Sequence, residues 1–227
     1  MRGSLTRQGF DMCGAARSHQ RMDPIRHEPA HPQTGRGAVC VYCASSRSAH
    51  PEYRQAAFEL GAVLAERGFE VVYGGGGAGS MGALADGALS QGGRVTGILP
   101  RFMADLEWGH KGLTELHLVE DMRTRKHLML ARSRGAIALP GGSGTLEELL
   151  EAITLKRLGL YSCPIILVNT RGFFDPLLEV FARAIAERFM DERHEAMWQV
   201  VSRPEEVPAA LADAPDWSAD ARAFAAI

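Results

Sequence analysis

Two glycine-rich segments of the sequence have the composition of loops that bind anions. GGGGAGSMG covers residues 74–82 and follows the apolar run VVY, and LPGGSGT covers residues 139–145 and follows GAIA. Glycine lets the backbone approach an anion closely, and the free N–H groups at the start of a helix point toward it. A tight turn with positive φ angles is the simpler interpretation, but four consecutive glycines exceed what a turn needs. We therefore expect the two segments to hold one phosphate group between them.

The spacing of the glycines does not by itself specify a nucleotide. The pattern G-x-G-x-x-G fits in two registers, one starting at Gly74 and one at Gly77. A dinucleotide site also requires an acidic residue about twenty positions further on, and the end of the next expected strand offers Pro100 and Arg101 instead. Arg101 would suit NADP, whereas NAD is poorly supported. A P-loop is excluded because the sequence lacks Gly-Lys-Ser/Thr.

The helix expected at residues 145–159, TLEELLEAITLKRLG, carries three acidic residues. Its buried stripe consists of Leu146, Leu149, Leu150 and Ile153. We interpret Glu147 and Glu151 as solvated residues that complement the helix dipole. Glu148 shares a face with Thr145 and Ala152, which places its carboxylate one turn below the expected phosphate loop. Two roles stay open for Glu148: a solvated surface residue, or a ligand for sugar hydroxyls or water.

An arginine occupies an apolar position in the helix expected at residues 121–133, DMRTRKHLMLARS. The stripe at helical spacing contains Met122, Arg125, Met129 and Ser133. An unpaired buried charge is costly, so an arginine on such a stripe is usually paired or in contact with a ligand. Arg123 and Arg132 are better candidates for side chains that extend along the surface.

Apolar segments alternate with amphipathic ones from residue 38 onward. We expect strands at 38–44, 69–75, 94–100, 115–120, 135–142 and 163–169, and helices at 51–68, 81–89, 121–133, 145–159, 175–189 and 204–214. Strands that are apolar throughout and alternate with helices imply a parallel sheet that is covered on both faces. The expected fold is a single α/β domain with a Rossmann-like, doubly wound parallel sheet. Ligands of such folds bind outside the carboxyl ends of the strands, where both glycine-rich segments lie.

The pattern divides the chain into three regions. Residues 1–37 are rich in Arg, His, Pro and Gly, and we expect a disordered tail or a segment upstream of a later start at Met12 or Met22. Residues 38–213 form the expected domain, and residues 214–227 a C-terminal tail. The net charge of −2 argues against bulk attraction to nucleic acid or to an anionic membrane. Without an apolar run that spans a bilayer or an apolar secretory region, the expected location is the cytoplasm.

The cysteines and histidines do not indicate a disulfide framework or a metal site. The four cysteines are irregularly spaced. Cys40 and Cys43 form a CxxC in AVCVYCAS, which is typical of a buried strand, so we expect buried thiols. His110, His117 and His127 lack the spacing of metal ligands and are interpreted as surface or capping residues. We expect no bound metal.

Three segments, VYGGGGAGSMG, DMRTRKHLM and LPGGSGTLEELLEAIT, resemble in order and spacing the LONELY GUY family of cytokinin riboside 5′-monophosphate phosphoribohydrolases, once labelled lysine decarboxylases. The resemblance begins at CVYCASS and extends to about Leu211. It implies hydrolysis of the N-glycosidic bond of N6-modified AMP, or of AMP itself, to the free base and ribose 5-phosphate. It implies no metal or redox cofactor, and a homodimer or a larger homo-oligomer.

The resemblance also assigns roles to residues. The catalytic arginine of the family corresponds to Arg125, and the glutamate of its motif corresponds to Glu148. The substrate-binding and phosphate-binding positions fall on Gly75, Gly76, Gly79, Ser80, Met81, Gly82, Met122, Lys126, Gly141, Gly142, Ser143, Gly144 and Thr145. The chain departs from the family pattern at TLKRLG instead of TWxQLG, at GAI instead of DAF, and at Ala44 instead of glycine. These departures concern oligomer type and base preference more than the chemistry.

The chemistry agrees with these assignments. Cleavage of the glycosidic bond develops positive charge on the ribose, which a carboxylate such as that of Glu148 stabilises while it orients or deprotonates water. The purine gains negative charge as it leaves, and Arg125 either stabilises its departure or holds the nucleotide by charge-assisted hydrogen bonds.

Three other functions stay open at this point. A decarboxylase needs a Schiff-base lysine for pyridoxal phosphate, and Lys111, Lys126 and Lys156 have no recognisable cofactor context. A non-catalytic nucleotide-binding or carrier module would use the same phosphate site without releasing base. A reductase would have to bind NADPH.

Overall fold

Seven parallel strands form one sheet in the computed structural model, which describes residues 25, 35–104 and 108–225. Most of the expected N-terminal tail therefore lies outside the described residues. The sheet order is β4-β3-β2-β1-β5-β6-β7, and every pair of neighbours is parallel. The strands are β1 (Ala38–Tyr42), β2 (Glu70–Tyr73), β3 (Val95–Pro100), β4 (Glu115–Val119), β5 (Ala136–Ala138), β6 (Ile165–Val168) and β7 (Gln199–Val201).

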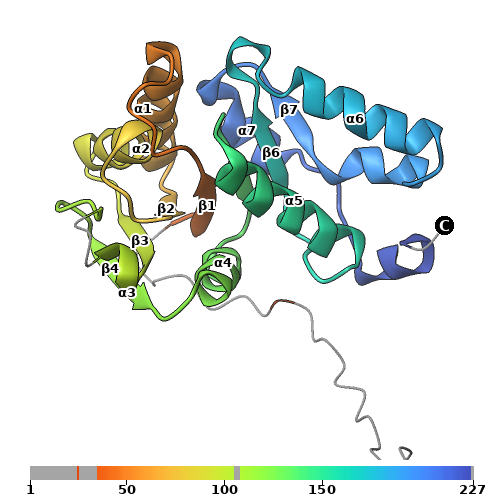
Figure 1. Cartoon of the computed structure of the whole chain (residues 1–227), viewed down its shortest axis with the longest axis horizontal. Helices are drawn as coiled ribbons and strands as arrows, with labels where there is room; N and C mark the ends of the chain where they lie inside the picture. Colours follow the sequence, from red (N-terminus) through yellow and green to blue (C-terminus); the bar gives the residue numbers. More distant parts are fainter. Residues whose placement is uncertain (1–24, 26–34, 105–107, 226–227) are drawn as a thin grey trace, which may run out of the picture.

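Helices cover both faces of the sheet, as the doubly wound prediction requires (Figure 1). One face packs against α1 (Pro51–Glu66), α2 (Gly79–Ser90) and α7 (Val207–Ala212). The other packs against α4 (Met122–Ala131), α5 (Ser143–Arg157) and α6 (Asp175–Ala186). Shorter elements are α3 (Arg101–Ala104) and the 3-10 helices η1 (Thr170–Gly172), η2 (Glu192–Met197), η3 (Pro204–Glu206) and η4 (Ala219–Phe224). The predicted α/β fold is thus confirmed.

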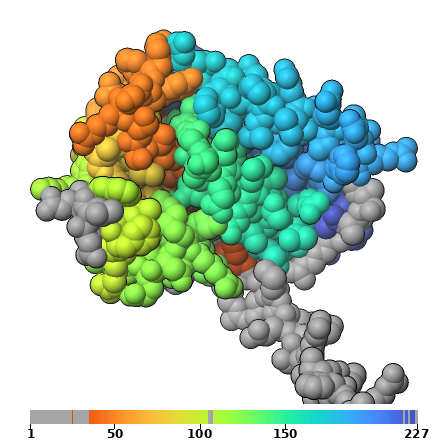
Figure 2. Space-filling view, viewed as in Figure 1, coloured from red at the N-terminus to blue at the C-terminus, as the bar shows by residue number. Residues whose placement is uncertain are grey.

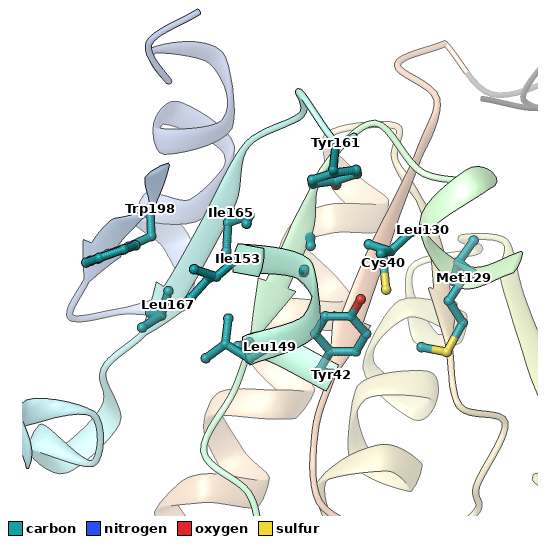
Figure 3. Packing of buried hydrophobic residues seen from close by; sticks show 14 of the residues in the cluster. Cys40, Tyr42, Met129, Leu130, Leu149, Ile153, Tyr161, Ile165, Leu167 and Trp198 are labelled. Carbon is teal, nitrogen blue, oxygen red and sulfur yellow. The ribbon is translucent and has the colours of Figure 1, made fainter. Parts of the chain in front are cut away.

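Alternation along the strands supplies both cores. In β1, Cys40 and Tyr42 point toward the α5 side, whereas Val39 and Val41 point toward α1. Figure 3 shows the α5 side, where side chains of α5 such as Leu149 lie over the sheet close to Tyr42. Burying one such apolar side chain contributes roughly 1.5–3 kcal/mol. This packing holds α5, and with it the side chains on its first two turns, firmly against the sheet.

The order in which strands are added to the sheet reverses at β1. From β1 it adds β2, β3 and β4 on one side, and it then returns to place β5 on the other side of β1. The loops that follow β2 and β5, which are the two glycine-rich segments, therefore flank the loop that follows β1. In the space-filling view the orange surface around residue 50 adjoins the green surface around residue 145 (Figure 2). Such a reversal is where open α/β sheets bind ligands.

Besides the 3-10 helices η1, η2 and η4, the structure contains one short strand and one short α-helix that the sequence pattern does not predict. Strand β7 has three residues and α3 has four, too few to show a period. The six expected strands and six expected helices are all present, with ends shifted by a few residues. In the region expected to be a C-terminal tail, the Trp217 indole N–H donates to the carbonyl oxygen of Lys156 at 2.7 Å, and Ala221 is buried. Among the described residues, no helix is long and apolar enough to cross a membrane.

Candidate active site

The first glycine-rich loop connects β2 to α2 in a conformation that requires glycine. Gly75 and Gly79 have φ angles of 78° and 59°, in the left-handed region. A Cβ added to Gly79 would lie 2.5 Å from the carbonyl oxygen of Ser46, and one added to Gly82 would lie 2.6 Å from that of Gly77. The loop is therefore folded tightly upon itself and against the segment that follows β1.

Two residues of the first turn of α2 tie the loop to its surroundings. The Met81 N–H donates to the carbonyl oxygen of Ala44 at 3.1 Å, and the buried Ser80 hydroxyl donates to that of Tyr53 at 3.4 Å. The side chain of Ser80 thus faces α1. The backbone N–H groups of Gly79 and Ser80 have no acceptor within the part of the chain that the structure describes. These two N–H groups are available for an anion.

The second glycine-rich loop ends in the first turn of α5. The carbonyl oxygen of Gly142, the N-cap residue, accepts from the Leu146 N–H at 3.0 Å. Thr145 is buried directly beside Gly141, where any added Cβ would overlap its side chain. Gly142, Ser143 and Gly144 are exposed. The first-turn N–H groups of α5 therefore open to solvent at the same sheet edge as those of α2.

Arg125 of α4 and Glu148 of α5 form a buried ion pair between these loops. Each residue is 5% exposed, and Arg125 Nη1 donates to Glu148 Oε1 at 2.7 Å. Arg125 Nε donates to the carbonyl oxygen of Ile98 in β3 at 3.2 Å. Nη2 lies against Gly74, at the end of β2, so closely that a Cβ on Gly74 would overlap it. Burial excludes one of the two roles left open for Glu148, that of a solvated surface residue, and its role as a ligand for sugar hydroxyls or water stays a prediction.

The electrostatics of the pair are set mainly by burial. Burial raises the pKa of Glu148 above its ordinary value, and the guanidinium of Arg125 acts in the opposite direction. Burial also raises the pKa of the thiols of Cys40 and Cys43, which are free and buried as expected. The site therefore contains one carboxyl group whose protonation responds to its environment, beside neutral thiols. Perturbed carboxyl groups of this kind are frequent at functional sites.

Lys126 of α4 pairs with two glutamates of α5, which the sequence interpretation did not foresee. Its Nζ is paired with Glu151 at 2.9 Å and also with Glu147, while its side chain is 13% exposed. The side chains of Glu147 and Glu151 are 56% and 38% exposed, in agreement with the solvated interpretation, and both also pair with this lysine from the adjacent helix. The helical pattern of α5 alone cannot reveal that the ammonium group of Lys126, on α4, lies beside these two glutamates.

Two apolar positions are also placed differently from the sequence interpretation. Leu150 is 40% exposed, so its assignment to the buried stripe of α5 is wrong. The buried face instead follows Thr145, Glu148, Leu149, Ala152, Ile153 and Lys156. Met122 is 36% exposed at the start of α4, while Arg125, Met129 and Ser133 of the same stripe are buried. The buried face of α5 contains polar residues, so the stripe of apolar residues in the sequence does not coincide with it.

The structure also brings in residues that the sequence analysis did not assign to the site. Ala44 and Ser46 of the loop after β1 contact the first glycine-rich loop. Trp108 and His110 contact it from the segment between β3 and β4. The reversal of sheet order predicts the first contact, since the loop after β1 must lie between its neighbours. No local pattern predicts the second contact.

Comparison with protein families and known proteins gives a consistent result. The family model described as "possible lysine decarboxylase" matches residues 81–211. A probable cytokinin riboside 5′-monophosphate phosphoribohydrolase of Oryza sativa subsp. japonica is 42% identical over 161 residues, which cover 71% of this chain and 72% of the relative. The cytokinin riboside 5′-monophosphate phosphoribohydrolase of Rhodococcoides fascians is 42% identical over 154 residues, covering 67% and 78% of the two chains.

Solved structures share the fold. The X-ray structure of the structural genomics target TM1055 has a TM-score of 0.61 and 28% identity, and the match covers 76% of this chain and 96% of that protein. The molybdenum cofactor carrier protein of Chlamydomonas reinhardtii has a TM-score of 0.60 and 20% identity, covering 78% and 96%. At that identity the carrier protein is evidence for the fold alone.

Proposed function

This chain belongs to the cytokinin riboside 5′-monophosphate phosphoribohydrolases, the LONELY GUY family, and from that premise we propose that it hydrolyses the N-glycosidic bond of a purine nucleoside 5′-monophosphate. The substrate is N6-modified AMP or AMP, and the products are the free base and ribose 5-phosphate. The observation that carries the proposal is the buried Arg125–Glu148 pair between two helix N-termini with open N–H groups. We assign the activity to residues 38–213 and the location to the cytoplasm.

The residues divide the work as follows. The loops at Gly75–Gly82 and Gly141–Thr145 hold the 5′-phosphate through backbone N–H groups, and Met122 lies near the base. Phosphate binding fixes the ribose, so that remote binding energy orients the reacting bond. The carboxylate of Glu148 stabilises the positive charge that develops on the ribose and accepts a proton from the attacking water. Arg125 holds this carboxylate in place and presents its remaining N–H groups toward the first loop.

The lysines do not support a decarboxylase. Burial lowers the pKa of Lys156 to about 8, which is a property of Schiff-base lysines. Its Nζ, however, donates to the carbonyl oxygen of Cys163 at 2.8 Å. Lys156 also lies two turns beyond Glu148 on α5, about 12 Å along the helix axis. Lys126 is engaged by two carboxylates, and Lys111 is exposed away from any such context.

The proposed reaction is tested by chromatography of the base released from AMP and from isopentenyladenosine monophosphate. We expect release from at least one nucleotide and none from the corresponding nucleoside, because the nucleoside lacks the phosphate. If a separate binding measurement detects AMP but chromatography detects no base released from either nucleotide, the carrier module is favoured. If the binding measurement detects NADPH, the reductase is favoured.

A methyl group at Gly74 should displace Arg125 while both residues of the ion pair keep their own side chains. In Gly74→Ala, the new Cβ overlaps Nη2 of Arg125, which cannot retreat because its other nitrogens are hydrogen-bonded. We expect kcat/KM to fall by about 10²-fold, since displacing a catalytic group by about 1 Å has that effect. Gly35→Ala is the control, because an added Cβ there meets nothing within 4 Å. Equal kcat/KM in both variants would show that the position of Arg125 does not matter.

We also propose that the protein is a homodimer or a larger homo-oligomer. β4 is the edge strand of the sheet, and its Leu116 and Leu118 are 43% and 42% exposed on one face. Two further apolar residues in the segments that precede and follow β4 are exposed: Phe102 of α3 is 51% exposed and Met122 of α4 is 36% exposed. An exposed apolar edge is normally covered by a partner. Light scattering should give at least twice the 24.6 kDa chain mass, and Leu118→Lys should reduce it; a wild-type monomer would contradict the proposal.

A further inference from the structure

A short segment between β3 and β4, residues 108–112, lies along the first glycine-rich loop. The Gly77 N–H donates to the carbonyl oxygen of Trp108 at 2.9 Å, and the His110 N–H donates to that of Gly75 at 2.9 Å. Gly76 and Gly109 form an antiparallel bridge between these two bonds. The segment therefore pairs with the loop in the manner of a strand, over the residues where the loop has no side chains.

The side chain of His110 connects this segment to α2. Its Nδ1 accepts from the Gly112 N–H at 3.0 Å, and its Nε2 lies 3.0 Å from Asp86 Oδ1. A backbone N–H can only donate, so Nδ1 is the acceptor and the proton of the neutral ring is on Nε2, facing the carboxylate. The His110 side chain is 14% exposed although Asp86 is 63% exposed. Both nitrogens of the ring are thus used within the protein.

These bonds restrain the part of the loop that is most free to move. Glycine loses more conformational entropy on folding than any other residue, and this loop contains four in succession. A phosphate that bound to an unrestrained loop would have to order it at a cost in affinity. His110 fixes the loop from both ends: its backbone N–H holds Gly75, and its ring is held by Asp86 on the helix that the loop starts. The binding N–H groups are thereby oriented before the ligand arrives.

We propose that His110 is a positioning residue, which holds the Gly74–Gly79 loop ready to bind the 5′-phosphate through its contacts with Asp86, Gly75 and Gly112. This inference rests on the proposed function for the identity of the substrate. It goes beyond the sequence interpretation of His110 as a surface or capping residue, since the ring accepts from the nearby Gly112 N–H and also contacts Asp86 on α2. It also separates binding from chemistry: His110 acts on the loop, whereas the Arg125–Glu148 pair acts on the ribose and the water.

The test compares variants that each keep one of the two ring contacts. His110→Asn retains an acceptor close to Nδ1, His110→Gln retains a donor close to Nε2, and His110→Ala retains neither. We expect the dissociation constants of AMP and of ribose 5-phosphate, measured by calorimetry, to rise about tenfold in His110→Ala and less in the other two. KM for AMP should rise in parallel while kcat changes by less than about threefold. His127→Gln, an exposed histidine on α4, is the control and should match wild type.

Several results would overturn the proposal. Wild-type dissociation constants in all three variants would show that the loop does not need His110, and a fall in kcat at constant KM would place His110 in the chemistry. If His110→Ala does not fold, Asp86→Asn provides the same test from an exposed residue, with a smaller rise in KM expected. A wild-type protein that binds AMP without releasing base would contradict the proposed function only, because the dissociation constants still measure the loop. A wild-type protein that binds neither ligand would overturn both.

Discussion

Replacing Glu148 by glutamine should lower kcat for nucleotide hydrolysis by about 10²- to 10⁴-fold, the usual contribution of a general acid or base. Glutamine has the same shape and still accepts the hydrogen bond that Arg125 Nη1 donates at 2.7 Å. It cannot accept a proton from water, and it carries no charge to stabilise the oxocarbenium-like ribose. Because both of the proposed phosphate-binding loops are unchanged, the dissociation constant of AMP should change by less than about threefold.

Controls separate the chemistry of Glu148 from its structural role. Thermal unfolding is needed beside the kinetics, because removing one charge of a buried pair destabilises proteins by about 3–5 kcal/mol when nothing compensates. Glu148→Asp keeps the charge but shortens the reach, and it should retain more activity than the glutamine variant. Glu179→Gln makes the same chemical change on an exposed position of α6 and should have no effect. A folded Glu148→Gln protein with wild-type kcat would remove Glu148 from the mechanism.

The raised pKa of Glu148 predicts how activity depends on pH. In the proposed mechanism the ionised carboxylate is the active form, so kcat/KM should fall on the acidic side, with a midpoint above the ordinary value of 4.5. The effect on stability has the opposite direction. Folded Glu148 holds its proton more tightly than the unfolded chain does, so its contribution is greatest below pH 4.5 and is lost as the pH rises through the folded-state pKa. A pH–rate profile beside a series of unfolding curves checks both signs.

Most of the fold is predictable because its signals are local. Six strands and six helices follow from the alternation of apolar and amphipathic segments, and the parallel sheet follows from strands that are apolar on both faces. Strand β7 escapes prediction because three residues show no period, and its place in the sheet is given by its pairing with β6. The ends of the strands place both glycine-rich loops correctly at one edge of the sheet.

Beyond the placement of these loops, the side-chain contacts of the candidate site are predictable where a residue breaks a local pattern. Arg125 does so, since a guanidinium on an apolar stripe indicates a buried partner, and the structure supplies Glu148. Two other contacts, Lys126 with two glutamates and His110 with Asp86, depend on how separate elements pack against each other. Neither has a signature in its own segment. The error at Leu150 has a related cause, because a buried face that contains glutamate and lysine does not look apolar in the sequence.

Replacing Arg125 by lysine should lower kcat/KM by about 10²- to 10³-fold, as the loss of a preorganised donor does. The guanidinium contacts three groups at fixed angles: Nη1 bonds Glu148, Nε bonds the carbonyl oxygen of Ile98, and Nη2 lies against Gly74. An ammonium group keeps the charge but cannot reproduce this planar arrangement. Arg123→Lys, on an exposed position of the same helix, should leave kcat/KM unchanged.

The pH profiles of two Arg125 variants test whether the arginine acts through the carboxylate. In Arg125→Lys a positive charge stays beside Glu148, so the acidic midpoint of kcat/KM should move little. In Arg125→Met the buried carboxylate loses the charge that lowers its pKa, and the midpoint should move to higher pH. Burial then acts unopposed by Arg125, which is why the methionine variant should be the less active one at neutral pH. Identical midpoints in both variants would mean that the titrating group is not Glu148, even if both proteins are slow.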